Sequence, residues 1–284
     1  MNSESEAAAV GSPPATQQVL EAERARKRHY TIHLVIVFAA ILVVLGIVLW
    51  LLGIDVQFMW GWLDFILTGV GYTLLVSTVA ISLSVSLALF GALGRLSKNP
   101  IASGISTFYV SLVRGTPLLV QVYMWYLALP QIGDSLEKLG FPALKGLFTL
   151  QAIPAGILAL GVCYGAYMTE TFRAGIQSIS KGQTEAAYAL GMTPAQTLRR
   201  IILPQAIRVV IPPIGNDFIA MLKDSSLVSL MGVWELTFRA TKIGRRYFRS
   251  LEMLLVAAVI YWIMTIVFQT LQSRLESHLA RGRR

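Results

Sequence analysis

Long apolar runs, interrupted at a few points by charged or helix-breaking residues, dominate this chain. A helix needs about 20 mainly apolar residues to cross the hydrocarbon core of a bilayer. Several segments reach this length, so the pattern predicts an all-α integral membrane protein with six transmembrane helices. The expected spans are Leu34–Ile54, Phe65–Leu93, Ile101–Pro130, Gly146–Thr169, Val209–Trp234 and Met253–Gln272.

The third and fifth expected spans contain helix breakers. Arg114, Gly115 and Pro117 interrupt the third, and Pro212 with Pro213 interrupts the fifth. Because proline lacks a backbone donor and clashes with the preceding turn, we expect a broken helix at the Pro212-Pro213 pair. At membrane depth such a break would expose backbone groups that suit a small zwitterion.

Residues 180–204, between the fourth and fifth spans, are less apolar and predict two short helices. Ser180 and Gln183 fit the N-terminal cap of the first helix. Gly191 fits its C-terminal end, where a left-handed residue is favoured. We therefore expect a compact helix-turn-helix foot that projects from the membrane, and we call residues 180–204 the coupling foot.

The second helix of the coupling foot has its own start and stop signals. Thr193 fits the N-cap, Pro194 the first helical position, and Gln196 the partner that completes a capping box. Pro204 predicts a break near Leu203, since the residue before proline avoids helical geometry.

Charged residues within or next to the apolar runs are candidates for function, because charges at membrane depth are costly and face protein or water. Arg114 fits either a side chain that extends to the cytoplasmic interface or a support for the following break. Glu170 fits either an interfacial position or a pathway position that attracts an ammonium group. The full set is Arg114, Glu170, Asp217, Lys223 and Asp224.

The charges after the proline pair also allow two interpretations. Asn216 and Asp217 are placed to contact a permeating solute, but Asp217 could instead pair with Lys223 or Arg208 within the subunit. Lys223 and Asp224 could pair with groups of a second subunit.

Composition supports the membrane assignment, since 14% of the residues are charged and 55% are hydrophobic. Soluble domains carry about 25% charged residues. The net charge of +9 indicates cytoplasmic loops near anionic lipid, and argues against a nucleic-acid-binding protein. Most Lys and Arg residues fall on the side of both termini, which predicts a cytoplasmic N-terminus, although a basic segment around Arg245 opposes this bias locally.

The pattern divides the chain into four parts. We expect a disordered tail at 1–28, an N-terminal transmembrane helix at 29–55, a transmembrane domain at 62–275 and a basic tail at 276–284.

Cys163 is the only cysteine, and no cluster of residues has metal-ligand spacing, so we expect no metal site. No phosphate-binding GxxxxGK[ST] loop occurs, so we expect no bound cofactor and no ATP hydrolysis by this chain.

The coupling foot resembles the EAA loop of bacterial ABC-importer permeases. The positions that carry the resemblance are Glu185, Ala186, Ala187, Gly191, Ile201, Leu203 and Pro204, at the family's spacing. Further segments resemble the branch of that family that carries polar amino acids such as histidine, arginine, glutamine or glutamate. These segments are 71–74, 114–121, 164–170, 213–217 and 223–227, and the match covers roughly residues 65 to 275.

The resemblance implies a type I importer permease core, here with an extra N-terminal span. It implies two permease subunits, identical or related, two ATPase subunits that bind ATP and magnesium, and an extracytoplasmic binding protein. Residues implied to couple to the ATPase are the seven above with Arg199 and Arg200. Candidates for the substrate pathway are Thr116, Gln121, Glu170, Asn216, Asp217 and Lys223. The expected location is a bacterial or archaeal cell membrane.

Two other classes of function stay open at this point. A secondary transporter or channel that works without an ATPase would carry inverted repeats and coupling carboxylates near the midplane. A membrane enzyme would need a metal cluster, a nucleophile with its base or a cofactor motif.

Overall fold

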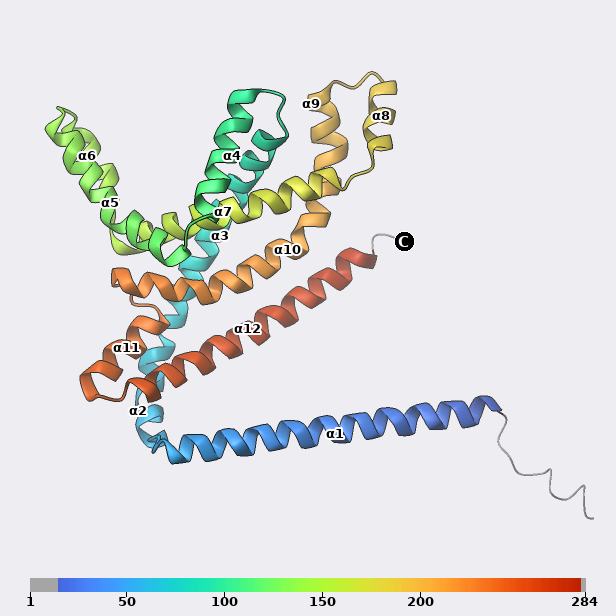
Figure 1. Cartoon of the computed structure of the whole chain (residues 1–284), viewed down its shortest axis with the longest axis vertical. Helices are drawn as coiled ribbons and strands as arrows, with labels where there is room; N and C mark the ends of the chain where they lie inside the picture. The colour runs from blue at the N-terminus through green and yellow to red at the C-terminus, as the bar shows by residue number, and fades with distance from the viewer. Residues whose placement is uncertain (1–14, 282–284) are drawn as a thin grey trace, which may run out of the picture. The chain divides into compact units, whose positions relative to one another are not determined.

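A computed structural model describes the backbone of residues 15–281, and this part of the chain is helical without strands (Figure 1). The chain forms two compact units, Met1–Val56 and Gln57–Arg284. The first contains α1 (Ala15–Leu51). The second contains nearly all of α2 (Val56–Leu67), then α3 (Gly69–Leu96), α4 (Pro100–Arg114), α5 (Leu118–Lys138), α6 (Pro142–Phe148), α7 (Ala152–Gln177), α8 (Lys181–Ala189), α9 (Pro194–Thr197), a π-helix (Leu198–Ile202), α10 (Leu203–Asp224), a 3-10 helix (Ser225–Met231), α11 (Leu236–Tyr247) and α12 (Ser250–Arg281).

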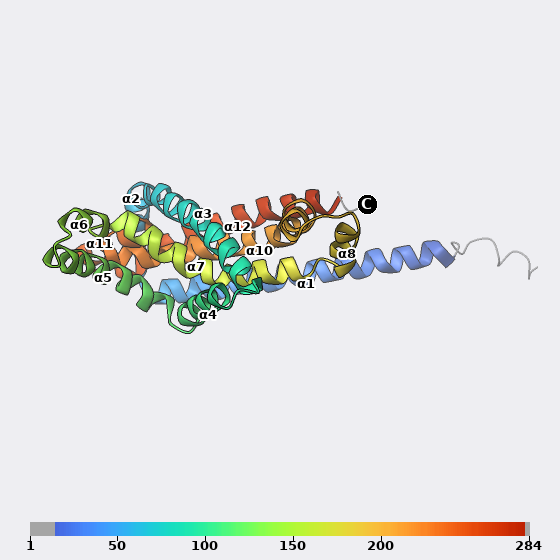
Figure 2. The same cartoon turned by 90° about the horizontal axis from the view of Figure 1, so that it is seen from above.

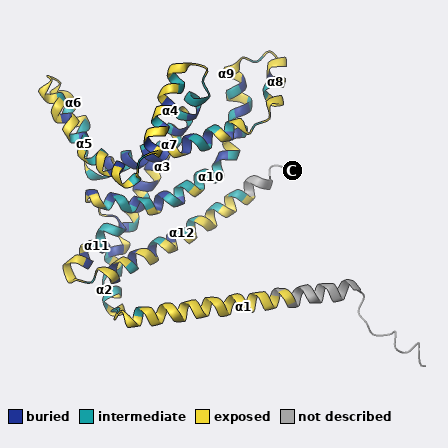
Figure 3. Cartoon of the chain, in the orientation of Figure 1, coloured by how far each residue is buried: buried dark blue, intermediate teal, exposed yellow. Residues whose placement is uncertain are grey.

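Helix α1 is a single helix of 37 residues, with nearly every described side chain exposed (Figure 3). Its stretch Arg28–Leu51 is apolar enough to cross a membrane. The prediction of a disordered tail through residue 28 is wrong from Ala15 onward, and its residues 1–14 lie outside the described part. The helix extends this far because residues 15–28 are rich in Ala, Glu, Arg and Gln, which favour helix.

Four helices among the described residues are long and apolar enough to span a membrane. Besides the stretch in α1, these are Gly69–Leu96, Ala152–Gln177 and Ser250–Ser277. The other two expected spans are divided or shortened. The all-α membrane fold is therefore confirmed, and the count of six spans stays a prediction.

The expected interruption of the third span is confirmed, because α4 ends at Arg114 and α5 begins at Leu118. A second break, at Thr68, was not predicted and divides the start of the second span into α2 and α3. Next to this break, Gly69 packs closely against the start of α11, since a Cβ on Gly69 would lie 2.7 Å from the backbone nitrogen of Leu236. Only glycine allows this approach.

The predicted break at Pro212 and Pro213 is wrong, because α10 runs through both prolines. The missing donors leave the carbonyl groups four residues earlier without their helical partners. Packing compensates for this loss: Val210 is 2% exposed and its Cγ1 lies 2.4 Å from where a Cβ on Gly175 would be. The Nε2 atom of Gln272 in α12 also donates to the carbonyl oxygen of Pro212 at 3.2 Å.

Helices α3 and α7 form the centre of the second unit, where buried residues concentrate (Figure 3). Gly161 and Gly165, which lie at GxxxG spacing on α7, allow the two helices to approach closely. A Cβ on Gly161 would lie 2.6 Å from Cδ2 of Leu83 on α3. The hydroxyl of Ser84 donates to the carbonyl oxygen of Gly161 at 3.0 Å, so polar and apolar contacts hold the same crossing.

Replacing Gly161 with leucine is expected to lower stability by about 1–3 kcal/mol, because the new side chain must displace Leu83 in a packed interface. The matched control is Gly71→Leu on α3, where nothing lies within 4 Å of an added Cβ. Thermal unfolding in detergent should show a lower midpoint for the first variant only. Equal midpoints for the two variants would contradict this account of the α3–α7 crossing.

Within the second unit, the coupling foot lies at one end, and α6 and α11 lie at the opposite end (Figures 1 and 2). The end of α12 lies on the same side as the foot.

Helices α5 and α6 are joined at their far end by Lys145, whose ammonium lies 2.7 Å from Glu137 and 3.1 Å from Asp134. The hydrogen bonds that the Lys145 ammonium donates, first to Glu137 and then to Asp134, raise the pKa of Lys145.

Candidate functional site: the coupling foot and the polar groups of the helical core

The first helix of the coupling foot, α8, begins as its sequence predicts. The Ser180 hydroxyl accepts from the backbone N–H of Gly182 at 3.3 Å. Gln183 does not complete a capping box, and its side chain instead lies 3.5 Å from Gln205 at the start of α10. The cap is thus confirmed, whereas Gln183 connects the two arms of the foot.

Gly191 ends α8 in the left-handed conformation, with φ +76°. The backbone N–H of Met192 donates to Ala187 at 3.1 Å, and that of Gly191 donates to Tyr188 at 2.9 Å. This pair of bonds is a Schellman motif, which satisfies carbonyl groups at the helix end. The predicted role of Gly191 in the turn is confirmed.

The second helix begins with the predicted capping box. Thr193 accepts from the N–H of Gln196 at 3.3 Å, and Gln196 accepts from the N–H of Thr193 at 2.8 Å. The predicted break near Leu203 is wrong, because the helix continues through the π-helix into α10. The N–H of Leu203 donates to the carbonyl of Leu198, five residues back. The wider turn accommodates Pro204, which has no N–H for the carbonyl of Arg200.

The foot has a packed interior and an exposed tip. Ala187 and Thr197 are 3% and 2% exposed and lie between its two arms. Leu190 at the tip is 82% exposed, and Tyr188 is 48% exposed. Elsewhere on the foot, Glu185, Ala186, Arg199, Arg200 and Pro204 are exposed, and Ile201 and Leu203 are half-buried. The foot therefore presents an exposed apolar tip and exposed cations, which suit contact with a soluble partner.

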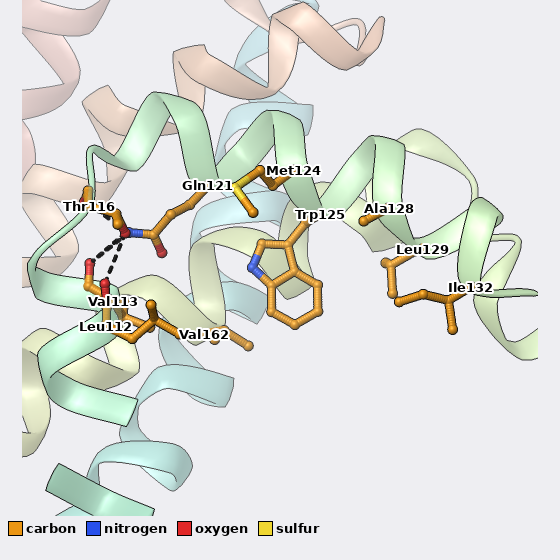
Figure 4. Close-up of a pocket in the computed structure, with 10 residues that line it drawn as sticks. All are labelled: Leu112, Val113, Thr116, Gln121, Met124, Trp125, Ala128, Leu129, Ile132 and Val162. Carbon is orange, nitrogen blue, oxygen red and sulfur yellow. Dashed lines mark hydrogen bonds between the residues drawn. The ribbon is translucent and has the colours of Figure 1, made fainter. Parts of the chain in front are cut away.

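In the transmembrane part, Gln121 supports the turn between α4 and α5 (Figure 4). Its Nε2 atom donates to the Val113 carbonyl at 2.7 Å, the Thr116 carbonyl at 3.0 Å and the Thr116 hydroxyl at 2.8 Å. The thiol of Cys163 on α7 lies 2.7 Å from Gln121 Oε1. Arg114, which was a candidate for this support, is exposed and stacks on Tyr167 at 5.7 Å.

Thr116 and Gln121 lie at one end of a hollow of about 290 Å³ that Met124, Trp125 and other apolar side chains line (Figure 4). Both polar side chains already form hydrogen bonds within the turn between α4 and α5, so the hollow offers few free polar groups to a polar solute. The structure therefore supports a positioning role for these two pathway candidates.

Replacing Gln121 with leucine is expected to cost about 2–3 kcal/mol, because two buried carbonyl groups and a thiol lose their partner. Gln131→Leu, at an exposed position of the same helix, is the matched control. Thermal unfolding in detergent measures the difference. If the unfolding midpoint of the Gln121 variant equals that of the control within error, the hydrogen bonds of Gln121 do not contribute to stability.

Glu170 lies in an ion-pair cluster at the foot end of α3 and α7. Its carboxylate lies 3.0 Å from Arg95 and 2.8 Å from Arg173. Arg173 also donates to Gln177 at 2.6 Å. These contacts favour the interfacial interpretation of Glu170 over a free pathway carboxylate, since two cations already neutralise it.

Asn216 connects two helices within the unit. Gln272 Nε2 lies 3.1 Å from Asn216 Oδ1, 3.2 Å from the Pro212 carbonyl and 2.8 Å from Glu276. This contact orients Asn216 toward α12. Gln272 was missed in the sequence, because it lies among other polar residues at the end of the last expected span and no local signal indicates that it faces the proline pair.

The remaining charges of α10 differ in their partners. Neither Lys223 nor Arg208 pairs with Asp217 in the described part of the chain, so that predicted pairing is wrong. Asp224 accepts from the Tyr164 hydroxyl of α7 at 2.6 Å. Lys223 is exposed at the end of the helix. Asp217 and Lys223 are therefore the pathway candidates that keep unpaired charge.

Sequence reasoning missed Glu235, a fully buried acid at the start of α11. Its carboxylate accepts from the backbone N–H groups of Thr237 and Phe238, both at 2.8 Å, and from the Tyr261 hydroxyl at 2.6 Å. Glutamate is not among the preferred N-cap residues, so local sequence rules did not indicate this cap.

Residues 80–281 match the family model of the binding-protein-dependent transport system inner membrane component. The chain belongs to this family. The L-cystine transport system permease protein TcyB of Bacillus subtilis is 41% identical over 218 residues, 75% of this chain and 86% of that protein. The glutamine transport system permease protein GlnP of Escherichia coli K12 is 32% identical over 225 residues, 79% and 97% of the two chains.

A crystal structure of an amino acid ABC transporter with histidines has a similar fold, with a TM-score of 0.68 and 36% identity. The likeness covers 79% of this chain and 99% of that chain. A member of this family is an inner-membrane transport component, and in ABC transporters a separate subunit hydrolyses ATP. The resemblance found in the coupling foot is thus confirmed, and a binding protein and an ATPase are partners of the family.

Proposed function

We propose that this chain is the permease subunit of an ABC importer for polar amino acids, and that its coupling foot transmits motion to and from the ATPase. The geometry of the foot carries the proposal. Two capped helices, joined by a Schellman turn, present Leu190 beyond a buried interior. A rigid element of this kind moves as one body when a partner moves.

The proposed assembly contains two permease subunits, identical or related, and two ATPase subunits that bind ATP and magnesium. Arg199 and Arg200 are exposed on the foot and would face an acidic rim of the ATPase. In this proposal Glu185, Ala187, Gly191 and Pro204 shape the foot. An extracytoplasmic binding protein delivers the amino acid to the opposite end.

The proposed orientation places the foot and both chain ends in the cytoplasm of a bacterial or archaeal cell. The end of α12 lies on the side of the foot, and an even count of six spans would bring the N-terminus to that side. The basic residues of the foot and of α12 agree with this orientation.

The proposed cargo follows from the relatives, whose names state cystine and glutamine as transported amino acids. Among the pathway candidates, Asp217 and Lys223 are the ones with charge left to recognise a zwitterion. Thr116, Gln121 and Asn216 would shape the helices around the pathway, and Glu170 would hold its inner end.

Co-purification with candidate ATPase subunits tests the proposal. We expect wild type to retain an ATPase, and Leu190→Glu to weaken the association at least about tenfold, because a leucine buried at an interface contributes about 1.5–3 kcal/mol. Leu147→Glu, at a 68% exposed position in α6, is the matched control. If no ATPase binds wild type and transport continues, an ATPase-independent transporter replaces this proposal.

A further inference from the structure

Helix α11 carries a row of cations at the end of the second unit opposite the coupling foot (Figures 1 and 2). Residues three or four apart in a helix share one side of it, and the cations of α11 follow this spacing. The buried residues of the same helix lie on its other side. We call the four cations the basic face, and they are Arg239, Lys242, Arg245 and Arg246.

The basic face keeps its charge. No carboxylate forms an ion pair with it in the part of the chain that the structure describes. The two acids that flank α11 have other partners, because Glu235 is buried and caps the helix, and Glu252 lies 3.0 Å from Arg249. The face therefore presents four positive charges to water or to an anionic partner.

Aromatic rings lie directly beside the basic face. The guanidinium of Arg239 lies 5.0 Å from the ring centroid of Phe65 and 5.4 Å from that of Trp234. It also donates to the backbone carbonyls of these two residues, at 3.3 Å and 2.9 Å. The ammonium of Lys242 lies 3.8 Å from the ring centroid of Trp234, which is 40% exposed. Exposed tryptophan beside Lys and Arg is typical of the level at which a membrane meets water.

The position of α11 in the chain places it at the same level. A Cβ on Gly244 would lie 2.7 Å from Cα of Ser250, so the end of α11 packs on the start of α12. The apolar stretch Ser250–Ser277 of α12 has 28 residues. A helix of that length is about 42 Å long, which is the thickness of a bilayer with its headgroups. The basic face therefore lies at the depth of the headgroups when α12 spans the membrane.

Phe248, in the turn between α11 and α12, is a second feature of this surface. Its ring is 95% exposed, and its backbone is left-handed, with φ 57°. This conformation is unfavourable for a bulky residue. Two hydrogen bonds hold it, because the N–H groups of Phe248 and Arg249 both donate to the carbonyl of Gly244. An apolar ring held outward at headgroup depth becomes buried if it enters the boundary between headgroups and acyl chains.

We propose that the basic face and Phe248 bind anionic phospholipid in the leaflet opposite the coupling foot. Lys242, Arg245 and Arg246 bind headgroup phosphates, and Phe248 inserts into the acyl boundary. Cations combined with an inserted apolar side chain are how interfacial helices bind anionic membranes. The neighbouring rings and Phe248 favour lipid over a soluble protein as the occupant. The inference requires that α12 spans a membrane, and it is independent of the cargo and of the ATPase.

Lipid binding measured by native mass spectrometry tests the proposal. The full chain, with any subunits that co-purify, is titrated in detergent with palmitoyl-oleoyl phosphatidylglycerol or palmitoyl-oleoyl phosphatidylcholine. We expect wild type to prefer the anionic lipid. The triple variant Lys242→Gln, Arg245→Gln and Arg246→Gln should lower the ratio of the two association constants at least about fivefold.

Two matched variants control for total charge and for folding. The first removes three exposed cations elsewhere and should keep most of the preference; its changes are Lys98→Gln, Lys138→Gln and Arg274→Gln. The second exchanges the cations but keeps their charge and should also keep the preference; its changes are Lys242→Arg, Arg245→Lys and Arg246→Lys. A lower preference in the glutamine triple variant alone supports the site.

Phe248→Ser tests the apolar part of the site. We expect it to weaken the binding of both lipids to a similar degree, because the ring contributes apolar burial and no charge. Unchanged binding of both lipids would overturn the role of the ring.

Three outcomes overturn the lipid site. Wild type could bind the two lipids equally, or the glutamine triple variant could keep the wild-type ratio. The third outcome concerns the family's binding protein, whose affinity is measured in nanodiscs of phosphatidylcholine alone. If the triple variant loses that affinity while its lipid ratio is unchanged, the basic face docks the binding protein instead of lipid.

Discussion

Gly191→Val is expected to abolish the stimulation of ATP hydrolysis by substrate-loaded binding protein while leaving the transmembrane part folded. Gly191 has φ +76°, and a left-handed conformation costs an L-residue roughly 1–2 kcal/mol, and more when its side chain is β-branched. Nothing lies within 4 Å of an added Cβ, so the effect comes from backbone strain and not from a clash. The two arms of the foot would then lose their fixed angle.

Two variants control this prediction. Gly191→Asn should keep most of the stimulation, because asparagine tolerates the left-handed region. Gly182→Ala, within α8, should behave as wild type, because the added Cβ would lie 3.6 Å from the Ser180 hydroxyl, an ordinary contact. ATP turnover of the reconstituted complex measures all three. Full stimulation in Gly191→Val would mean that the angle of the foot does not matter for coupling.

Glu235→Ala is expected to produce the largest loss of stability, about 3 kcal/mol or more. The substitution removes the cap of α11, leaves the Thr237 and Phe238 N–H groups without an acceptor, and removes the acceptor that lies 2.6 Å from the Tyr261 hydroxyl. A lost cap costs about 0.5–2 kcal/mol, and a buried polar group left without a partner costs about 1–3 kcal/mol. The midpoint of thermal unfolding in detergent should fall accordingly.

The control for burial is Glu137→Ala, which removes an exposed carboxylate that lies 2.7 Å from Lys145. An exposed ion pair contributes about 1 kcal/mol or less, so this variant should change little. Glu235→Gln should fall between the two, since the amide oxygen can still cap one N–H. Similar midpoints for Glu235→Ala and Glu137→Ala would contradict the buried-cap account.

Local sequence signals predicted the coupling foot closely because its structure depends on local rules. Gly191 adopts the left-handed backbone conformation because it has no Cβ. Thr193 and Gln196 form a capping box within four residues. Those preferences act over one or two helical turns. A single sequence contains all the information they need.

Long-range packing overruled local signals elsewhere. Pro212 and Pro213 should break a helix, but contacts with α7 and Gln272 of α12 hold it together. Gly69 lies against the backbone at Leu236, far along the chain, and its local sequence does not indicate this contact. Likewise, Glu170 is neutralised by Arg95 of another helix, which its own segment does not reveal. Which polar groups stay free for a solute therefore depends on the folded arrangement.

The central claim is that this chain forms the pathway of an ATP-driven amino-acid importer, and uptake into proteoliposomes tests it most directly. The chain is reconstituted with its ATPase and binding protein, and radiolabelled glutamine, cystine, arginine and histidine are offered with and without ATP. We predict accumulation of at least one amino acid that requires ATP, the binding protein and an intact Gly191. Accumulation that proceeds without ATP, or no uptake from a complex that hydrolyses ATP, would contradict the account.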